Sequence, residues 1–106
     1  MSVTVILRYE GTSADRFDRE YYCNTHMPKA KREWTPYGLL DARVFFPALQ
    51  DSRKGTVCIC ECVFSDEAAV KAAFTAACTR ELVADIANFT DLPMTPAILK
   101  TLSAEG

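Results

Sequence analysis

The run of residues 56–64 constrains the fold of this chain more than any other segment, because nearly every position in it is apolar. Its β-branched and small apolar residues predict a strand, in which side chains alternate between two faces. One face consists of Cys58, Cys60, Cys62 and Phe64, and the other of Val57, Ile59 and Val63 with the single interruption Glu61. A strand that is apolar on both faces needs a cover on each side of its sheet.

Three further segments are predicted to be strands. Residues 2–10 and residues 39–46 alternate between side chains of opposite character, which is typical of a strand with two different faces. Residues 94–102 form a last extended segment, and Pro96 within it favours a position at the sheet edge, because proline has no backbone N–H to donate.

Two helical regions separate the strands. The first has Ser13 or Asp15 as its predicted N-cap and a stripe of residues at helical spacing, and Pro28 is expected to end or kink it beside His26. That stripe consists of Phe17, Tyr21 and Thr25. The second begins at Ser65, with acidic residues in its first turn. Its stripe consists of Val70, Ala73, Phe74 and Ala77, and a short further helical piece carries Leu82, Val83 and Ile86.

The resulting order β-α-β-β-α-β is the ferredoxin-like pattern of the α+β class, a four-stranded antiparallel sheet with two helices on one face. At 106 residues, positions 1–106 are expected to form a single domain. Two helices cover one face of the sheet only. We therefore expect a second copy of the chain to cover the other face in a two-fold homodimer, the alternative being an isolated monomer.

The pairing of residues 39–46 with residues 56–64 can also be predicted, because the hydrophobic pattern restricts which residues share a face. The even-numbered residues of the first strand, Leu40, Ala42, Val44 and Phe46, are expected on the face of the cysteines. Asp41 and Arg43 then share the other face with Glu61. Arg43 opposite Glu61 joins unlike charges, and we predict this register.

Charge and composition exclude several classes of function. The net charge is −2, so there is no excess of Lys and Arg to neutralise a nucleic-acid backbone. No apolar run approaches the roughly 20 residues of a membrane-spanning helix, and the first residues do not resemble a signal peptide. These features predict a cytoplasmic protein without nucleic-acid or membrane partners.

The three cysteines of residues 56–64 are predicted to be core-facing thiols. Alternate positions of a strand lie about 6.5 to 7 Å apart, so neighbours bond poorly, if at all, and the three cannot converge on one zinc ion. We expect no disulfide and no metal site.

Two blocks of sequence resemble the EthD family, which is named for ethyl tert-butyl ether degradation. The first runs over residues 17–28 and contains Tyr-Tyr and Thr-His-Met-Pro, followed by Trp34 and by Tyr-Gly-Leu at residues 37–39. The second is Asp-Ile-Ala-Asn-Phe-Thr-Asp at residues 85–91. The resemblance implies a dimeric α+β barrel in which each subunit encloses a cavity between its helices and its sheet. Lys29, Lys31, Arg32 and Pro47 depart from the family pattern, which has apolar residues after His-Met-Pro and a glycine where the second strand ends.

The positions similar to the family are His26 and Tyr22 in the first block, Trp34 and Tyr37 after it, and Asn88 to Thr90 in the second. Histidine is the side chain whose ordinary pKa suits proton exchange near neutral pH, so His26 is a candidate general base or acid. Its alternative role is to cap backbone carbonyls freed near Pro28. The hydroxyl of Tyr22, one turn before His26, could orient a substrate oxygen, or the ring could be core.

The remaining candidates would bind the ligand. Tyr9, at the end of the first strand, could reach the same end of the cavity, while Trp34 and Tyr37 either form the wall of an aromatic site or fill the loop. Asn88 and Phe89 are binding candidates too, although an asparagine there can bond turn backbone instead. The basic cluster Lys29, Lys31 and Arg32 is either a solvated face or favours a substrate with a carboxylate.

Three functions are compatible with these residues. The first is a cofactor-free enzyme of isomerase, dehydratase or lyase type, in which His26 moves a proton on a small cyclic or aromatic compound. The second is a binding protein for such a compound. The third is an oxidoreductase, either a reductase as some family names suggest or a haem-type enzyme with His26 as axial ligand. No Gly-rich nucleotide loop is present, which disfavours a reductase that holds its own cofactor, and we expect no cofactor.

Overall fold

Four antiparallel strands form one sheet in the computed structural model, which describes residues 2–48 and 53–100. The strands are β1 (Val3–Gly11), β2 (Leu39–Phe45), β3 (Gly55–Phe64) and β4 (Met94–Lys100). Their order across the sheet is β2-β3-β1-β4, so β4 lies at an edge, as its proline predicted. Part of the predicted last strand, residues 101 and 102, lies outside the described residues.

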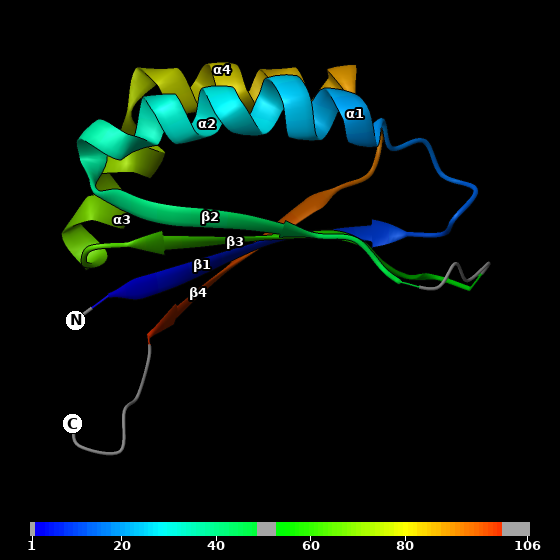
Figure 1. Ribbon diagram of the computed structural model, residues 1–106, viewed down its shortest axis with the longest axis horizontal. Helices are drawn as coiled ribbons and strands as arrows, with labels where there is room; N and C mark the ends of the chain where they lie inside the picture. The colour runs from blue at the N-terminus through cyan, green and yellow to red at the C-terminus, as the bar shows by residue number, and fades with distance from the viewer. Residues whose placement is uncertain (1, 49–52, 101–106) are drawn as a thin grey trace.

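The helices pack on one face of this sheet, which confirms the predicted ferredoxin-like α+β arrangement (Figure 1). The first helical arm consists of α1 (Arg19–Tyr21), the π-helical turn η1 (Tyr22–His26), α2 (Met27–Trp34) and the 3₁₀ turn η2 (Thr35–Tyr37). The second consists of α3 (Glu67–Thr75), α4 (Ala77–Asp85) and the 3₁₀ turn η3 (Ile86–Asn88). None of the helices in the described ranges is long and apolar enough to cross a membrane.

The core lies between these helices and the sheet. Residues of β1 and β3 alternate strictly between buried and half-buried over most of their length, and the cysteine face of β3 is completely buried, as predicted. Phe64 packs edge-on against Phe74 of α3, with ring centroids 6.0 Å apart. Burial of one such large apolar side chain contributes roughly 1.5–3 kcal/mol to stability.

The predicted N-cap of the first helix, Ser13 or Asp15, is wrong. Asp18 caps it instead, because its carboxylate accepts the backbone N–H of Tyr21 at 3.0 Å. The Asp15 carboxylate accepts the N–H of Thr12 at 2.7 Å and so closes a turn in the preceding loop. Phe17 consequently lies outside the helix, where it forms a β-bridge with Thr90.

Pro28 disturbs the helix where the sequence predicted but does not end it. The backbone N–H of Met27 donates to the carbonyl of Tyr22, five residues earlier, which widens the helix by one residue. Pro28 then stands at the start of α2, where a missing N–H is tolerated. The helix therefore continues to Trp34, and its buried face is Tyr22, His26, Met27, Ala30 and Trp34.

The second arm differs from its prediction at both ends of α3. Asp66 rather than Ser65 is the N-cap, since its carboxylate accepts the N–H of Ala69 at 2.7 Å. Ala76 adopts an extended conformation and breaks the arm, so Ala77 begins α4 and is exposed instead of extending the stripe. The predicted short piece is α4, with Leu82 buried.

The hairpin register is confirmed at its charged pair and is wrong at one residue. Arg43 lies opposite Glu61, and its Nη2 is 2.9 Å from Glu61 Oε1. A β-bulge between Leu39 and Asp41 shifts the pattern, so Leu39 is buried opposite Phe64 while Leu40 is 64% exposed. The extra residue therefore puts Leu39 on the buried face in place of Leu40.

All five cysteines have free thiols. The Sγ atoms of Cys60 and Cys62 lie 3.5 Å apart, closer than the spacing along the strand suggests, because the two side chains lean together. This separation corresponds to a thiol–thiol contact in the core.

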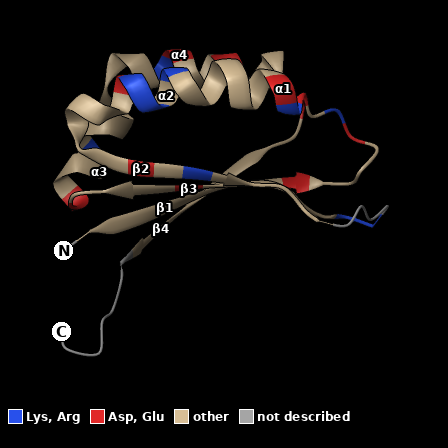
Figure 2. Ribbon diagram, viewed as in Figure 1, with Lys and Arg blue, Asp and Glu red and all other residues tan. Residues whose placement is uncertain are grey.

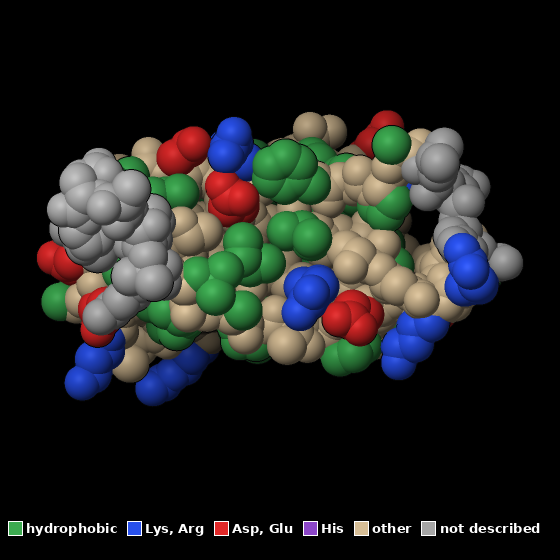
Figure 3. Space-filling view, turned by 90° about the horizontal axis from the view of Figure 1, so that it is seen from below, with side chains coloured by type: hydrophobic (Ala, Val, Ile, Leu, Met, Phe, Trp, Pro, Cys, Tyr) green, Lys and Arg blue, Asp and Glu red, His purple; other side chains and the backbone are tan. Residues whose placement is uncertain are grey.

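No helix covers the opposite face of the sheet in the part of the chain that the structure describes (Figure 1). Hydrophobic side chains gather in the middle of this face beside charged ones (Figure 3). Leu99 of β4 is 50% exposed and Phe45 of β2 is 46% exposed. Ile59 and Val63, in the middle of the sheet, are half-buried.

Candidate functional site

His26, the one histidine of the chain, faces the core from the π-helical turn and is 7% exposed. The ring of Tyr22, four residues earlier, stacks on the imidazole with an interplanar angle of 16° and centroids 5.5 Å apart. Phe89 approaches the same ring edge-on, at 4.8 Å between centroids. These two aromatic rings fix the orientation of the imidazole.

The carboxylate of Asp85 is the hydrogen-bonding partner of His26. Asp85 is the last residue of α4, and its Oδ2 is 2.9 Å from His26 Nδ1. Its other oxygen, Oδ1, accepts the hydroxyl of Tyr21 at 2.6 Å and the side-chain amide of Asn88 at 2.8 Å. Partial burial raises the pKa of the Asp85 carboxyl, but the hydrogen bonds from Tyr21, His26 and Asn88 outweigh it and lower that pKa to about 2.

An ionised carboxylate only accepts hydrogen bonds, so the contact requires a hydrogen on His26 Nδ1. Neutral imidazole then carries its lone pair on Nε2. Within residues 2–48 and 53–100, no protein group is hydrogen-bonded to Nε2. The pair therefore presents a nitrogen that can accept a proton or a hydrogen bond from a ligand.

A cavity of about 210 Å³ lies beside this imidazole, between the helices and strands β1 and β4. Its wall consists of Leu7, Tyr9, His26, Trp34, Phe74, Thr79, Leu82, Val83, Ile86, Met94 and Pro96. The hydroxyl of Thr79 accepts the indole N–H of Trp34 at 2.8 Å and is also directed to the Ala73 carbonyl. Apart from His26, Tyr9 and the engaged hydroxyl of Thr79, the wall offers a ligand apolar surface.

The structure brings three of the sequence-predicted site residues together in this wall, namely His26, Tyr9 and Trp34. Tyr22 and Phe89 lie behind the imidazole and contact it, but neither lines the cavity. Burial raises the pKa of the Tyr9 and Tyr22 hydroxyls far above the ordinary tyrosine range, so both stay protonated.

Tyr37 and Asn88 stand elsewhere. Tyr37, in the turn η2, is 40% exposed and does not line the cavity. Asn88 is exposed and donates to Asp85 rather than facing the cavity. It reaches the imidazole only through that carboxylate.

Sequence reasoning missed Asp85 and Tyr21 as parts of the site. Asp85 opens the second block that resembles the family, but nothing in the pattern shows that it pairs with a histidine 59 residues away. The contact between Asp85 and His26 depends on where α4 ends relative to the π-helical turn. The spacing of hydrophobic residues in the sequence reveals neither the end of α4 nor the π-helical turn.

The turn after η3 anchors the site to the first arm. Asp18 donates its backbone N–H to the Phe89 carbonyl at 2.8 Å, and the buried Thr90 hydroxyl donates to the Arg16 carbonyl at 2.6 Å. Arg16 also binds Asp91 through two hydrogen bonds, of 2.9 and 3.1 Å. Phe89 is thereby held against His26, and the role of Thr90 is structural.

The basic cluster of α2 does not line the cavity. Lys29 forms an ion pair with Glu81 of α4 at 3.6 Å, and Lys31 and Arg32 are exposed. Figure 2 shows basic residues on the α2 ribbon. This arrangement favours the solvated-face interpretation of the cluster over recognition of a carboxylate.

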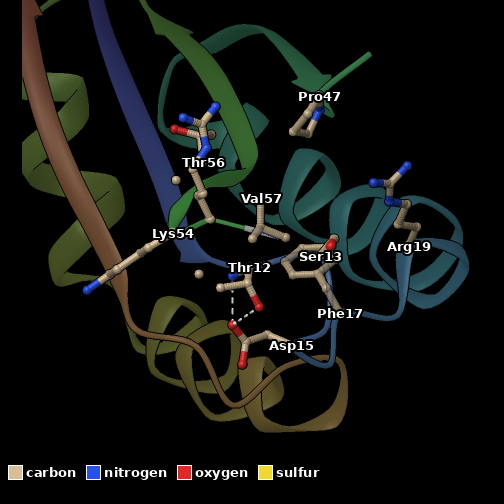
Figure 4. Close-up of a pocket in the computed structure, with 12 residues that line it drawn as sticks. Thr12, Ser13, Asp15, Phe17, Arg19, Pro47, Lys54, Thr56 and Val57 are labelled. Atoms are coloured by element: carbon tan, nitrogen blue, oxygen red, sulfur yellow. Dashed lines mark hydrogen bonds between the residues drawn. The ribbon is translucent and has the colours of Figure 1, made fainter. Parts of the chain in front are cut away.

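A second pocket, of about 320 Å³, opens at the end of the sheet between the loop after β1 and the hairpin arms (Figure 4). Its rim carries Arg19, Arg53 and Lys54, while its one acidic residue, Asp15, is held by Thr12. His26 is not among the lining residues. The two pockets therefore differ in the charge of their walls: the cavity beside His26 is apolar, and the second pocket is largely cationic.

No group of three or more His, Cys, Asp or Glu side chains in the described residues could hold a metal ion. Two glycines, Gly11 and Gly55, are paired across β1 and β3 in the second pocket. A Cβ added at Gly11 would meet Asp15 and Leu92, whereas one added at Gly55 would meet no atom within 4 Å.

Comparison with known proteins identifies the fold. The family model described as EthD domain matches residues 10–93. A solved EthD-like protein from Ralstonia eutropha JMP134 is 24% identical with a TM-score of 0.80, and the match covers 97% of this chain and 94% of that one. An ethyl tert-butyl ether degradation family protein from Bacillus halodurans C-125 is also 24% identical, with a TM-score of 0.70 and coverage of 96% and 100%.

A more distant likeness is to SnoaB, a cofactor-independent oxygenase from Streptomyces nogalater. It is 8% identical with a TM-score of 0.70, over 97% of this chain and 95% of that one. No curated protein sequence matches the chain. These solved structures share the α+β fold of this chain.

Proposed function

The chain belongs to the EthD family, and from this membership we propose that it is a cofactor-independent enzyme that transfers a proton on a small cyclic or aromatic compound. One observation carries the proposal. His26 lines an apolar cavity while its Nδ1 lies 2.9 Å from the ionised carboxylate of Asp85.

In the proposed reaction, His26 Nε2 takes a proton from an acidic C–H or O–H of the bound compound. The imidazolium that forms is stabilised by Asp85, whose charge is already in place and is oriented by Tyr21 and Asn88. Return of the same proton to another atom of the compound completes an isomerisation, and its delivery to a leaving group completes an elimination. General base catalysis of this kind typically contributes roughly 10²- to 10⁴-fold in rate.

The cavity supports a compound of one or two rings. Its volume of about 210 Å³ is below the roughly 300–1,000 Å³ typical of sites for drug-sized ligands. A porphyrin does not fit it, so the site as it stands does not suit a haem-type activity. SnoaB is described as cofactor-independent, which is compatible with a fold that supports chemistry by side chains alone.

We also propose that the open face of the sheet binds a second copy of the chain. Ile59 and Val63 are half-buried on this face, which also carries exposed Leu99 and Phe45 and the ion pair of Arg43 and Glu61. An exposed apolar face that also carries charges of both signs can form a self-complementary two-fold interface. The cytoplasmic location stays a prediction.

The catalytic proposal is tested with a panel of catechol, lactone and enone compounds, measuring both turnover and exchange of their protons in heavy water. His26→Ala should abolish turnover and exchange while binding persists. Asn24→Ala, an exposed substitution in the same turn, serves as the control. Turnover that survives in His26→Ala contradicts the proposal, and binding of the panel without turnover in the native protein indicates a binding protein instead.

A further inference from the structure

The wall of the His26 cavity contains no Lys, Arg, Asp or Glu among the described residues. The carboxylate of Asp85 lies one hydrogen bond behind the imidazole. A ligand that carried a carboxylate would leave water, find no cation in the wall and lie close to a like charge. Burial of such an unpaired anion is strongly unfavourable.

The hydrogen-bonding groups of the wall are few. The Thr79 hydroxyl is already engaged by Trp34 and by the Ala73 carbonyl. Tyr9 keeps a neutral hydroxyl, because burial raises its pKa. The Nδ1 of His26 is hydrogen-bonded to Asp85. The atom of His26 that remains for a ligand is therefore Nε2, whose lone pair accepts a hydrogen bond.

We propose that the His26 cavity selects an uncharged, largely hydrocarbon ring compound that donates one hydrogen bond, from an O–H, to His26 Nε2. Phenols and the enol forms of ring ketones belong to this class. This specificity rests on the proposed function, because it takes the His26 cavity as the ligand site.

The basic cluster of α2 and the basic residues of the second pocket all lie outside the wall of the His26 cavity. Lys29 is paired with Glu81, while Lys31 and Arg32 are exposed on α2. Arg19, Arg53 and Lys54 surround the other pocket, at the hairpin end of the sheet (Figure 4). An anion attracted to the protein would therefore collect away from His26.

Three probes of nearly equal size test the proposal. Para-propylphenol and para-ethylanisole are isomers, and the first has the O–H donor that the second lacks. Para-ethylbenzoate adds a negative charge. Each is titrated into the protein while the signals of His26 and Trp34 are followed by heteronuclear NMR. The chain has one histidine and one tryptophan, and both line the cavity, so these signals report binding there.

We expect para-propylphenol to bind about tenfold more tightly than para-ethylanisole, as the loss of one hydrogen bond to a buried acceptor predicts. Para-ethylbenzoate should leave the His26 and Trp34 signals in place at the same concentrations. In Asp85→Asn the preference for the phenol should fall, whereas in the control Asp41→Asn, an exposed residue of β2, it should persist.

The outcomes separate this specificity from the function on which it rests. Equal binding of the two isomers, or binding of the benzoate in contact with Trp34, overturns the proposed specificity and leaves the catalytic proposal standing. If none of the three probes moves either signal, the cavity is not the ligand site, and both proposals fail.

Discussion

His26 Nδ1 and Asp85 Oδ2 lie 2.9 Å apart, and this contact joins the π-helical turn of the first arm to the last residue of α4. A carboxylate at the C-terminal end of a helix is opposed by the helix dipole. Three donors, from His26, Tyr21 and Asn88, compensate for that unfavourable position. The hydrogen bonds that hold the Asp85 carboxylate in place therefore also orient the imidazole of His26.

Asp85→Asn should destabilise the protein in a pH-dependent way. The folded-state pKa of about 2 lies below the ordinary 3.8, so the carboxylate contributes stability that is fully present above about pH 4 and is lost as the pH falls towards 2. The contribution is about 2 kcal/mol. Urea denaturation should show a difference between native and variant protein that shrinks over this pH window. A difference that stays constant would contradict the assignment, and Asp41→Asn is the matched control.

Gly38→Ala should destabilise the fold by about 1–3 kcal/mol. Gly38 ends η2 with a φ of 111°, and an added Cβ would lie 2.7 Å from the Cβ of Ala69 and 2.8 Å from the hydroxyl of Ser65. Gly55→Ala is the control, because a Cβ there meets no atom within 4 Å. Equal unfolding free energies for the two variants would show that the turn at Gly38 is not constrained as described.

Thiol reactivity should divide the five cysteines by burial. Cys23 is exposed and should react with a thiol reagent in the native protein, while Cys58, Cys60 and Cys62 should be protected. Burial raises the pKa of the Cys58 thiol to about 12, so mildly alkaline buffer should not deprotonate this thiol. Denatured protein should titrate as five thiols. Rapid native reaction of the β3 cysteines would refute the packing of the core.

Much of the fold follows from the spacing at which hydrophobic residues recur along the sequence. The strict alternation of β1 and β3 fixes which face is buried, and opposite charges on Arg43 and Glu61 select the hairpin register. The sequence-based prediction of the elements failed at two kinds of position. One is where a strand or helix contains an extra residue, and the other is where two neighbouring residues can both serve as the N-cap of a helix. The bulge at Leu40 and the widened turn before Pro28 each add a residue, and neither leaves a signal in the pattern.

The site was predictable only in part. His26 could be singled out by its chemistry, and Tyr9 and Trp34 do share its cavity. The pairing with Asp85 depends on tertiary packing between the two helical arms, so the residue that decides which ring nitrogen is free was not identified from sequence.

The proposed dimer predicts that a charge placed in the middle of the open face will separate the subunits. Ile59→Lys should convert a dimer at micromolar concentration into monomer, because its ammonium would be buried without a partner. Val83→Lys, which places a lysine at a 55% exposed position of α4, should not. Analytical ultracentrifugation decides between these states. Native protein that sediments only as monomer would rule out the dimer.

The tautomer of His26 tests the central claim most directly, and the single histidine makes its ring nitrogens readily assignable by NMR. The spectrum is recorded at a pH well above the ordinary histidine range, where imidazole is neutral. We predict that Nδ1 carries the hydrogen and that Nε2 has the chemical shift of a bare nitrogen, with this preference lost in Asp85→Asn. A hydrogen on Nε2 in the native protein would contradict the account, because the atom proposed to take the proton would already hold one.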